Sequence, residues 1–250
     1  MEGLVQSLSA FLKGRNPGEM SKADASAWLR HERDTRGNTG KTLEKKGTLV
    51  GALFSQTRDA GGGGYHARVW LPLLGLFTGA RLNELGRLVV GDIQGDPVPH
   101  FDIRRAKNSG SLRAVPLHPQ LVELGFLEYV EALKAAGQEC LWPCLRSGGD
   151  PGTDGDVLGR WFSRYLHQGL GFPATVVFHS FRHSFRDFCR NAGIARDVHH
   201  QLTGHASGAA GDAYGAGYSL DVFHGEVSRI RLPLAIPKPL PYAGSRKVRP

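Results

Sequence analysis

The sequence has little cysteine and no long apolar run. Its three cysteines are an odd number at irregular spacing, which predicts no disulfide framework, and no second cysteine pair completes a zinc site with Cys140 and Cys144. No apolar stretch approaches the length that crosses a membrane, and the N-terminus lacks the basic start and apolar run of a signal peptide. We therefore expect reduced thiols and a cytoplasmic protein.

Signatures of several common enzyme classes are also missing. The four-glycine run at 61–64 lacks the spacing of a phosphate-binding loop and the Lys-Ser/Thr pair that follows one. No G-x-S-x-G elbow of a serine hydrolase is present, and the acidic residues of the polar loop 146–157 do not have the spacing of a calcium-binding EF-hand. The sequence therefore predicts no nucleotide cofactor and no calcium site.

The chain does have an ordinary globular composition with a basic balance. Of its 250 residues, 40% are hydrophobic and 22% are charged, which is typical of a soluble domain. The formal net charge of +8 and the isoelectric point near 9.6 favour a polyanionic partner, with nucleic acid as the first candidate. Charge alone would also fit a merely basic soluble protein.

Hydrophobic periodicity predicts a mainly α-helical chain with one small antiparallel β-hairpin. Helical spacing covers 21–29, 68–90 with a break at Thr78-Gly79, 120–136, 161–166, 178–191, 195–202 and 220–230. Strand character covers 100–105 and 112–117, joined by a turn at 107–110. We expect four parts: a short helical region at 1–60, a glycine-rich linker at 61–66, a catalytic domain at 67–232 and a basic, proline-rich tail at 233–250.

The stretch 178–214 gathers residue types that suit a phosphate-cleaving site. His179 and Arg182 lie three residues apart on a predicted helix, so they project from neighbouring positions of its surface. Gly204 ends the next predicted helix, and His205 follows this break. The stretch therefore offers a histidine and an arginine on one helix and a second histidine at the end of another.

A tyrosine and three upstream residues complete the set. Tyr214 lies nine residues after His205 among small residues with little to pack against, which favours a functional tyrosine over a core one, and Tyr218 is the competitor. Arg81 and Glu84 share a helix face directly after an apolar run, where a charge needs a partner or a bound anion; a surface ion pair is the alternative. Lys107 lies at the tip or shoulder of the hairpin, a position that also suits an ordinary solvated lysine.

These residue types suit the cutting and rejoining of a phosphodiester. Two guanidinium groups can neutralise the charge on a pentacovalent phosphorus, a tyrosine oxygen can attack it, and a lysine can protonate the departing 5′ oxygen. The scheme needs no metal and no cofactor. A metal site is the competing interpretation, but the helix lacks the glutamate of a metalloprotease motif, so we expect no metal at the clustered histidines, which are His179, His183, His199, His200 and His205.

In these motifs the sequence resembles the tyrosine recombinase (phage integrase) family. The resembling stretches are TGARLNEL around Arg81, AKNSGSLRAVPLHP around Lys107, FHSFRH around His179 and Arg182, and LTGH followed by AYG. They span roughly residues 70–230. The sequences WLPLLGLFTGARLNEL and VFHSFRHSF look most like those of integrases of proteobacterial genomes and prophages. Each stretch alone is a weak signal, whereas their order and joint spacing are specific.

The resemblance implies a catalytic-domain fold and a role for each site residue. It implies that Arg81, Arg182 and His205 bind the scissile phosphate, and that His179 hydrogen-bonds this phosphate and assists proton transfer. Tyr214 would be the nucleophile that forms a 3′-phosphotyrosyl link, and Lys107 would be the general acid. Glu84 would be a supporting residue. The resemblance also implies double-stranded DNA as the substrate, a homo-tetramer that exchanges strands through a Holliday junction, and a place at the bacterial nucleoid or a prophage. The C-terminal segment of family members often docks on a neighbouring subunit, a role that the last helix and the tail could take here.

Two other functions stay open at this point. The same chemistry serves a nicking and closing enzyme like the type IB topoisomerases. A DNA-binding remnant or regulator of attachment sites, without recombinase activity, is favoured by the short helical region at 1–60, because the family's DNA-clamping domain is a larger helical bundle. The complete set of catalytic residue types instead favours a strand-exchange enzyme.

Overall fold

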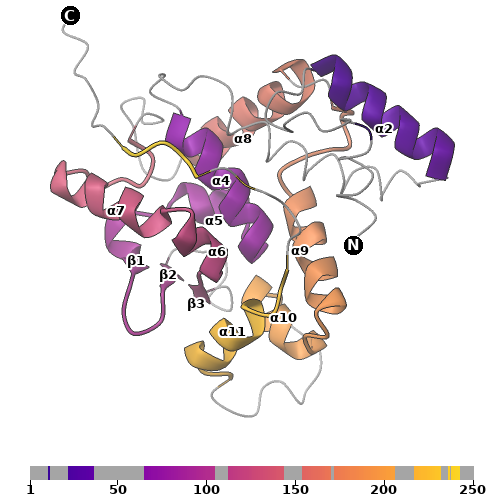
Figure 1. The fold of residues 1–250 in the computed structure, drawn as a ribbon. Helices are drawn as coiled ribbons and strands as arrows, with labels where there is room; N and C mark the ends of the chain where they lie inside the picture. Colours follow the sequence, from indigo (N-terminus) through magenta and orange to yellow (C-terminus); the bar gives the residue numbers. More distant parts are fainter. Residues whose placement is uncertain are drawn as a thin grey trace, which may run out of the picture.

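The computed structural model describes residues 11, 22–36, 65–104, 112–143, 154–169, 172–205, 217–231, 236 and 238–242. Helices predominate among them, with one small sheet (Figure 1). In chain order the elements are α2 (Lys22–Arg36), α4 (Tyr65–Thr78), α5 (Leu82–Gly86), a 3-10 turn (Val90–Asp92), β1 (Ile93–Gln94), β2 (His100–Ile103), β3 (Arg113–Pro116), α6 (Pro119–Glu123), α7 (Phe126–Ala135), α8 (Asp154–Arg164), a π-helical turn (Tyr165–Gly169), α9 (Ser180–Asn191), α10 (Arg196–Thr203) and α11 (Leu220–Val227).

Helix α4 lies at the centre of the core. Its sequence, YHARVWLPLLGLFT, is apolar on nearly every side, and twelve of its fourteen residues are buried. A helix that is apolar all round is stable only when other elements cover it, and here α5, α6 and α9 do so. The helix ends at Thr78 because Gly79 adopts a φ of +64°, a conformation that L side chains rarely adopt. The predicted break at Thr78-Gly79 is thereby confirmed.

Two glycines let α9 approach α4 closely. A Cβ at Gly75 would lie 2.8 Å from the ring of Phe178, and a Cβ at Gly79 would lie 2.7 Å from the ring of Phe185. The predicted inward face of α9 is confirmed, since Phe181, Phe185 and Phe188 are all buried. This close packing places the buried polar residues of α9 beside the end of α4.

The sheet has three antiparallel strands in the order β1-β2-β3. The predicted hairpin strands are present, with Phe101 opposite Val115 and Ile103 opposite Arg113. Because directly opposed residues point to the same side of a sheet, Arg113 lies on the face of the buried residues Phe101, Ile103 and Val115. The two-residue strand β1 was not predicted, and the turn at 107–110 lies outside the described residues.

Three predicted boundaries differ from the structure. The helix expected over 120–136 is two helices, α6 and α7, because Gly125 has a φ of +95° and interrupts the backbone hydrogen bonding. Helix α8 starts at Asp154, inside the predicted polar loop 146–157. Helix α4 starts at Tyr65, so the last two residues of the predicted linker 61–66 are helical.

The last described residues fold back onto the centre of the molecule. Helix α11 contacts β3, and the segment 238–242 runs without helix or strand past α4 and α7 (Figure 1). The backbone N–H of Leu240 donates to the hydroxyl of Tyr65 at 3.0 Å, and the ring of Tyr242 lies 5.9 Å from the ring of Tyr129. The described part of the predicted tail therefore lies against α4 and α7 of the same chain.

The predicted fold class, mainly helical with a small antiparallel sheet, is confirmed. The helix expected from residue 21 is present as α2, whose Trp28 is fully buried. The other helices expected in 1–60 lie outside the described residues, and the division of the chain into four parts stays a prediction. Within the described ranges, every helix is too short or too polar to cross a membrane.

Candidate functional site

Arg81 and Glu84 start the site at the junction of α4 and α5. Arg81 precedes the first residue of α5, and its backbone N–H donates to Oε2 of Glu84 at 2.8 Å. Its guanidinium Nη1 donates to Oε1 of the same carboxylate, also at 2.8 Å. The Glu84 side chain is only 6% exposed, whereas that of Arg81 is 41% exposed. The predicted pair is therefore present, with a buried acid that holds a partly exposed arginine.

Arg113 on β3 is a second partner of Glu84, and it was not predicted as a site residue. Its guanidinium donates to both carboxylate oxygens of Glu84, at 3.3 Å and 3.1 Å, and its Nε donates to the carbonyl of Leu202 at 2.9 Å. Burial alone would raise the pKa of Glu84, but the hydrogen bonds and charge of Arg113, followed by the contacts with Arg81, hold it below its ordinary value. Glu84 is therefore ionised at neutral pH.

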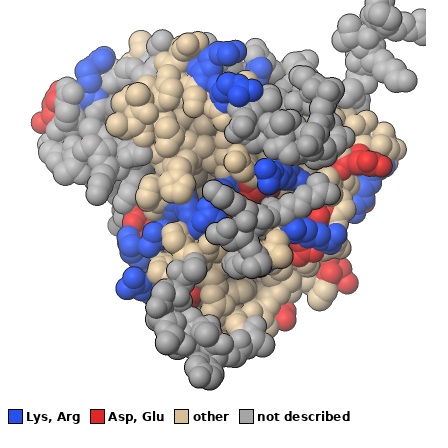
Figure 2. Space-filling model, turned by 180° about the vertical axis from the view of Figure 1, so that it is seen from behind, with Lys and Arg blue, Asp and Glu red and all other residues tan. Residues whose placement is uncertain are grey.

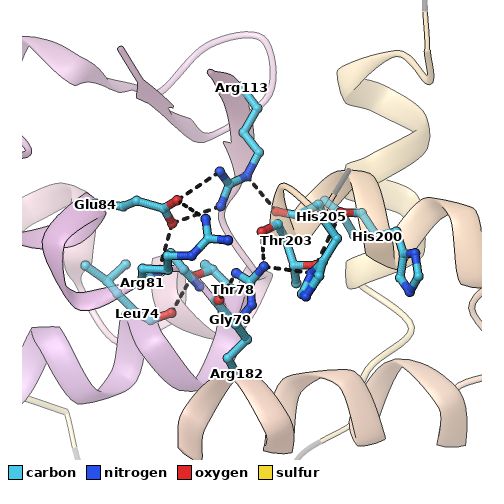
Figure 3. Close-up of polar contacts among 12 residues, drawn as sticks. Leu74, Thr78, Gly79, Arg81, Glu84, Arg113, Arg182, His200, Thr203 and His205 are labelled. Atoms are coloured by element: carbon cyan, nitrogen blue, oxygen red, sulfur yellow. Dashed lines mark hydrogen bonds and ion pairs between the residues drawn. The ribbon is translucent and has the colours of Figure 1, made fainter. Parts of the chain in front are cut away.

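Arg182 lies at the centre of the site, on the buried side of α9. Its side chain donates to the carbonyl of Gly79 at 2.9 Å, to the carbonyl of Thr203 and to Nδ1 of His205 at 2.8 Å (Figure 3). The residue is only 2% exposed, and burial, together with the charge of Arg81, lowers the pKa of Arg182 to about 10. These contacts use three of its five N–H groups, and all three acceptors are neutral.

His205 is held in one tautomer by its neighbours. Since Arg182 has only donors, Nδ1 of His205 accepts its hydrogen bond, and the ring proton of the neutral form is on Nε2. Nδ1 also lies 3.0 Å from the hydroxyl of Thr203. Burial, followed by the charge of Arg182, lowers the pKa of His205 to about 4. At neutral pH His205 is therefore a neutral ring that presents an N–H at Nε2.

The cluster carries an uncompensated positive charge. Figure 3 shows Arg81, Arg113 and Arg182 converging from three separate parts of the fold, with Glu84 beside Arg81 and Arg113 and with His205 beside Arg182. Arg81 and Arg113 share the carboxylate of Glu84, whereas the described contacts of Arg182 are all with neutral acceptors, so these four side chains carry a net charge of +2 with His205 neutral. A buried cation without a carboxylate partner is unfavourable unless an anion binds. The arrangement therefore suits a phosphate-sized anion near Arg81 and Arg182.

The other predicted site residues are placed differently. His179 immediately precedes α9 and is exposed, and its ring lies 5.0 Å from that of His183 in a T-shaped arrangement. Lys107 and Tyr214 lie outside the described residues, so their roles stay predictions. The competitor Tyr218 is described: it is 38% exposed, and its hydroxyl donates to Asp197. Of the seven predicted residues, the structure brings together Arg81, Glu84, Arg182 and His205.

The histidines near the site make ring contacts with one another. The ring of His200 lies 5.5 Å from that of His205 and 4.8 Å from that of His199. Burial lowers the pKa of His199 to about 4. In the parts of the chain that the structure describes, no three His, Cys, Asp or Glu side chains are grouped so that they could hold a metal ion.

Comparison with curated proteins finds two that are named resolvase. The chain is 28% identical over 183 residues to a resolvase of Escherichia coli K12, which covers 64% of this chain and 67% of that protein. A second Escherichia coli resolvase is 27% identical to the chain over 183 residues. This match covers 64% of this chain and 69% of that resolvase. No family model matches the chain.

Two solved structures are also similar to the chain. The crystal structure of XerA recombinase has 18% sequence identity and a TM-score of 0.43, over 82% of this chain and 81% of that one. The integrase of transposon Tn1549, solved in complex with transposon right-end DNA, has 18% sequence identity and a TM-score of 0.44. The match covers 92% of this chain and 91% of that one. All four proteins are named resolvase, recombinase or integrase. The sequence similarity to the two resolvases agrees with the resemblance that the motifs indicated.

Proposed function

We propose that this chain cuts and rejoins DNA strands as a site-specific recombinase or integrase, through a covalent link between Tyr214 and a 3′ phosphate. The observation that carries the proposal is the cluster in which Arg81 and Arg113 share the Glu84 carboxylate and Arg182 contacts only neutral described acceptors, which gives these four side chains a net charge of +2. Arg81 is exposed enough to meet a phosphate, and Arg182 lies behind it with unused N–H groups. The basic net charge of +8 supports a polyanionic substrate.

The surface agrees with a nucleic-acid partner. Figure 2 shows Lys and Arg side chains in several groups across the middle of one face, with acidic side chains interspersed mainly to one side. Basic groups spread over a face neutralise successive backbone phosphates, and they supply affinity that does not depend on sequence. The proposed duplex therefore binds over an extended surface, while the cluster acts on one phosphate.

In the proposed reaction, the Tyr214 oxygen attacks the scissile phosphorus, and the bond to the 5′ oxygen breaks. Arg81 and Arg182 neutralise the charge that develops on the non-bridging oxygens, and the Nε2–H of His205 donates to one of them. His179 assists removal of the tyrosine proton, and Lys107 protonates the departing 5′ oxygen. Attack by a 5′ hydroxyl on the phosphotyrosine reverses these steps, so no external energy source is needed.

The test is covalent trapping on nicked suicide duplexes tiled across the DNA that flanks the coding gene. We expect a protein–DNA adduct that resists denaturation and forms in the presence of a chelator, because the scheme uses no metal. A chain that binds these duplexes without forming an adduct is a DNA-binding remnant instead. Relaxation of supercoiled DNA without exchange between two duplexes would assign the nicking and closing activity.

A further inference from the structure

We propose that Arg113 is a positioning residue of this site, which sets the spacing between Arg81 and His205 without contacting the substrate phosphate. The inference rests on the proposed function and assigns a role to a residue that the motif resemblance left out. Arg113 comes from the sheet, whereas Arg81 precedes α5 and His205 follows α10. Like Arg182, Arg113 contacts both halves of the cluster.

The first half is reached through Glu84. The two nitrogens of Arg113 meet the two carboxylate oxygens side by side, a bidentate geometry that fixes orientation as well as distance. The same carboxylate takes the backbone N–H and Nη1 of Arg81. The orientation of Arg81 is thus set by a carboxylate that Arg113 holds in place.

The second half is reached through the end of α10. Nε of Arg113 donates to the carbonyl of Leu202 at 2.9 Å, three residues before His205. Gly204 lies directly against the guanidinium: a Cβ there would lie 2.6 Å from Nη1 of Arg113, and its φ of +62° also favours glycine. The close approach of Arg113 and Gly204 therefore fixes where the chain turns into His205.

These contacts close a ring around the site. From Arg113 the ring runs through Glu84 to Arg81, along the backbone to Gly79, across to Arg182 and on to the end of α10. From there the carbonyl of Leu202 leads back to Arg113. The Arg113 side chain is only 10% exposed, so it lies behind the groups that face solvent. This is the position of a residue that orders the phosphate ligands and is not itself one of them.

The charge environment of Glu84 provides a signature of this role. The charged groups near its carboxylate are Arg81, directly before its own helix, Arg113 on β3 and Arg182 on α9. On its other side a small cavity is lined by further charged residues, namely Arg87, Asp92, Asp102 and Arg104. When Arg113 is removed, burial of Glu84 persists while its strongest opposing partner is lost, so its pKa rises. Protonated Glu84 then releases Arg81 at a pH where the wild-type site is intact.

The experiment compares the wild-type chain with Arg113→Met, Arg113→Lys and the control Arg229→Met. Arg229 also joins a carboxylate, Glu226, to a helix-end carbonyl, that of Ala192, but it is half exposed. Single-turnover adduct formation on the suicide duplex is followed from pH 5 to pH 9, together with duplex binding. For Arg113→Met we expect a rate about 100-fold lower, as for a catalytic group displaced by about 1 Å. Duplex affinity should stay within about threefold, because the side chain is buried away from the backbone phosphates.

The pH profile separates positioning from a merely structural role. In Arg113→Met the rate should fall toward low pH from a higher pH than in the wild type. Arg113→Lys keeps the charge but cannot span both carboxylate oxygens and the Leu202 carbonyl. It should restore the wild-type profile and only part of the rate, while Arg229→Met should match the wild type. The proposal is overturned if Arg113→Met cleaves at the wild-type rate, or if both variants lose rate equally with an unchanged profile.

A second measurement does not depend on DNA cleavage. Calorimetric titration with inorganic phosphate should show binding to the wild-type chain and to Arg229→Met. It should show at least about fivefold weaker binding to Arg113→Met and to the charge-conserving Arg113→Lys, because displaced ligands lose bidentate contacts. If no duplex gives an adduct and phosphate binding still depends on Arg113, the proposed function fails while the positioning role holds. If adducts form and Arg113 affects neither measurement, only the positioning role fails.

Discussion

Arg182 and His205 form a single unit, in which Nη2 of the arginine donates to Nδ1 of the histidine at 2.8 Å. The contact joins α9 to His205, two residues after the end of α10, and leaves the Nε2–H of His205 as a donor. Arg182 has a further acceptor in the Gly79 carbonyl, at the end of α4. One planar guanidinium therefore aligns three segments that are distant in sequence, and it does so from a position that is almost fully buried.

Arg182→Lys should abolish cleavage, although it keeps the charge. A lysine ammonium is a single point on a flexible stem, so it cannot reach Gly79, Thr203 and His205 together. We expect an adduct rate at least about 100-fold lower, the usual effect of removing a group that stabilises charge in the transition state. Duplex binding in a gel-shift assay should change little, because Arg182 is one buried contact among many surface charges. Wild-type cleavage by Arg182→Lys would contradict its place in the phosphate site.

Tyr214→Phe should remove the covalent adduct, and Tyr218→Phe should leave it. The second tyrosine is the matched control, since it lies four residues away and carries the same hydroxyl. Its hydroxyl is engaged with Asp197, the second residue of α10, on an exposed surface. Trapping on the suicide duplex, followed by peptide mapping of the adduct, measures both variants. An adduct that persists in Tyr214→Phe and maps to residue 218 would reverse the assignment.

Gly79→Ala should destabilise the fold and slow cleavage together. The new Cβ would lie 2.7 Å from the ring of Phe185, and the φ of +64° strains any L side chain. We expect a loss of about 1–3 kcal/mol in the free energy of unfolding, measured with urea. The Gly79 carbonyl also moves, and with it the Arg182 contact. Gly91→Ala is the control, because nothing lies within 4 Å of its Cβ. Equal stability of the two variants would contradict the close packing of α4 and α9.

Stability should fall as the pH drops from about 6.5 to about 4. The pKa values of His66, His199 and His205 are each lowered to about 4, first by burial, whereas unfolded histidines titrate near 6.5. Between these values the unfolded chain binds more protons, so protonation favours unfolding; above pH 6.5 the three rings are neutral in both states and stability is unaffected by them. Urea unfolding at pH 8, 6 and 5 measures the effect.

A single variant isolates one of these protons. His66→Phe keeps the ring stacked on Tyr129, from which His66 lies 4.8 Å, and removes the titrating group. The free energy of unfolding of His66→Phe should decline less steeply with falling pH than that of the wild type. Above pH 7 the free energies of unfolding of the two proteins should depend on pH in nearly the same way. Parallel curves below pH 6.5 would show that His66 carries none of the pH dependence.

The sequence predicted the half of the site that depends on local spacing. Arg81 and Glu84 are three residues apart on one helix, and a glycine directly after an apolar run marks the junction that precedes them. Arg182 and His205 were found from their chemistry and from the glycine that ends α10. That these residues meet depends on the close packing of α4 and α9, which is a tertiary relationship that spacing alone does not give.

Arg113 shows what a sequence interpretation can miss and why. It sits in a predicted strand, in phase with Val115 and Leu117, which are both buried. An arginine in phase with a buried row is a signal that it has a partner inside the protein. The signal names no partner, however, because Glu84 lies 29 residues away and Leu202 lies 89 residues away. The break at Gly125 was missed for a related reason. A helix can contain a glycine, so the sequence alone does not show that Gly125 has a positive φ and interrupts the helix.

The hydrogen bond from Leu240 to Tyr65 brings the two ends of the region 65–242 together in space. Tyr65 is the first residue of the central helix, and Leu240 follows α11, the last helix among the described residues. The order in which the elements occur along the chain is therefore separable from the packing that holds them. A short linker from 242 to 65, with new ends at the exposed turn 135–137, gives a circular permutant that keeps the arginine cluster but lacks α2 and its buried Trp28.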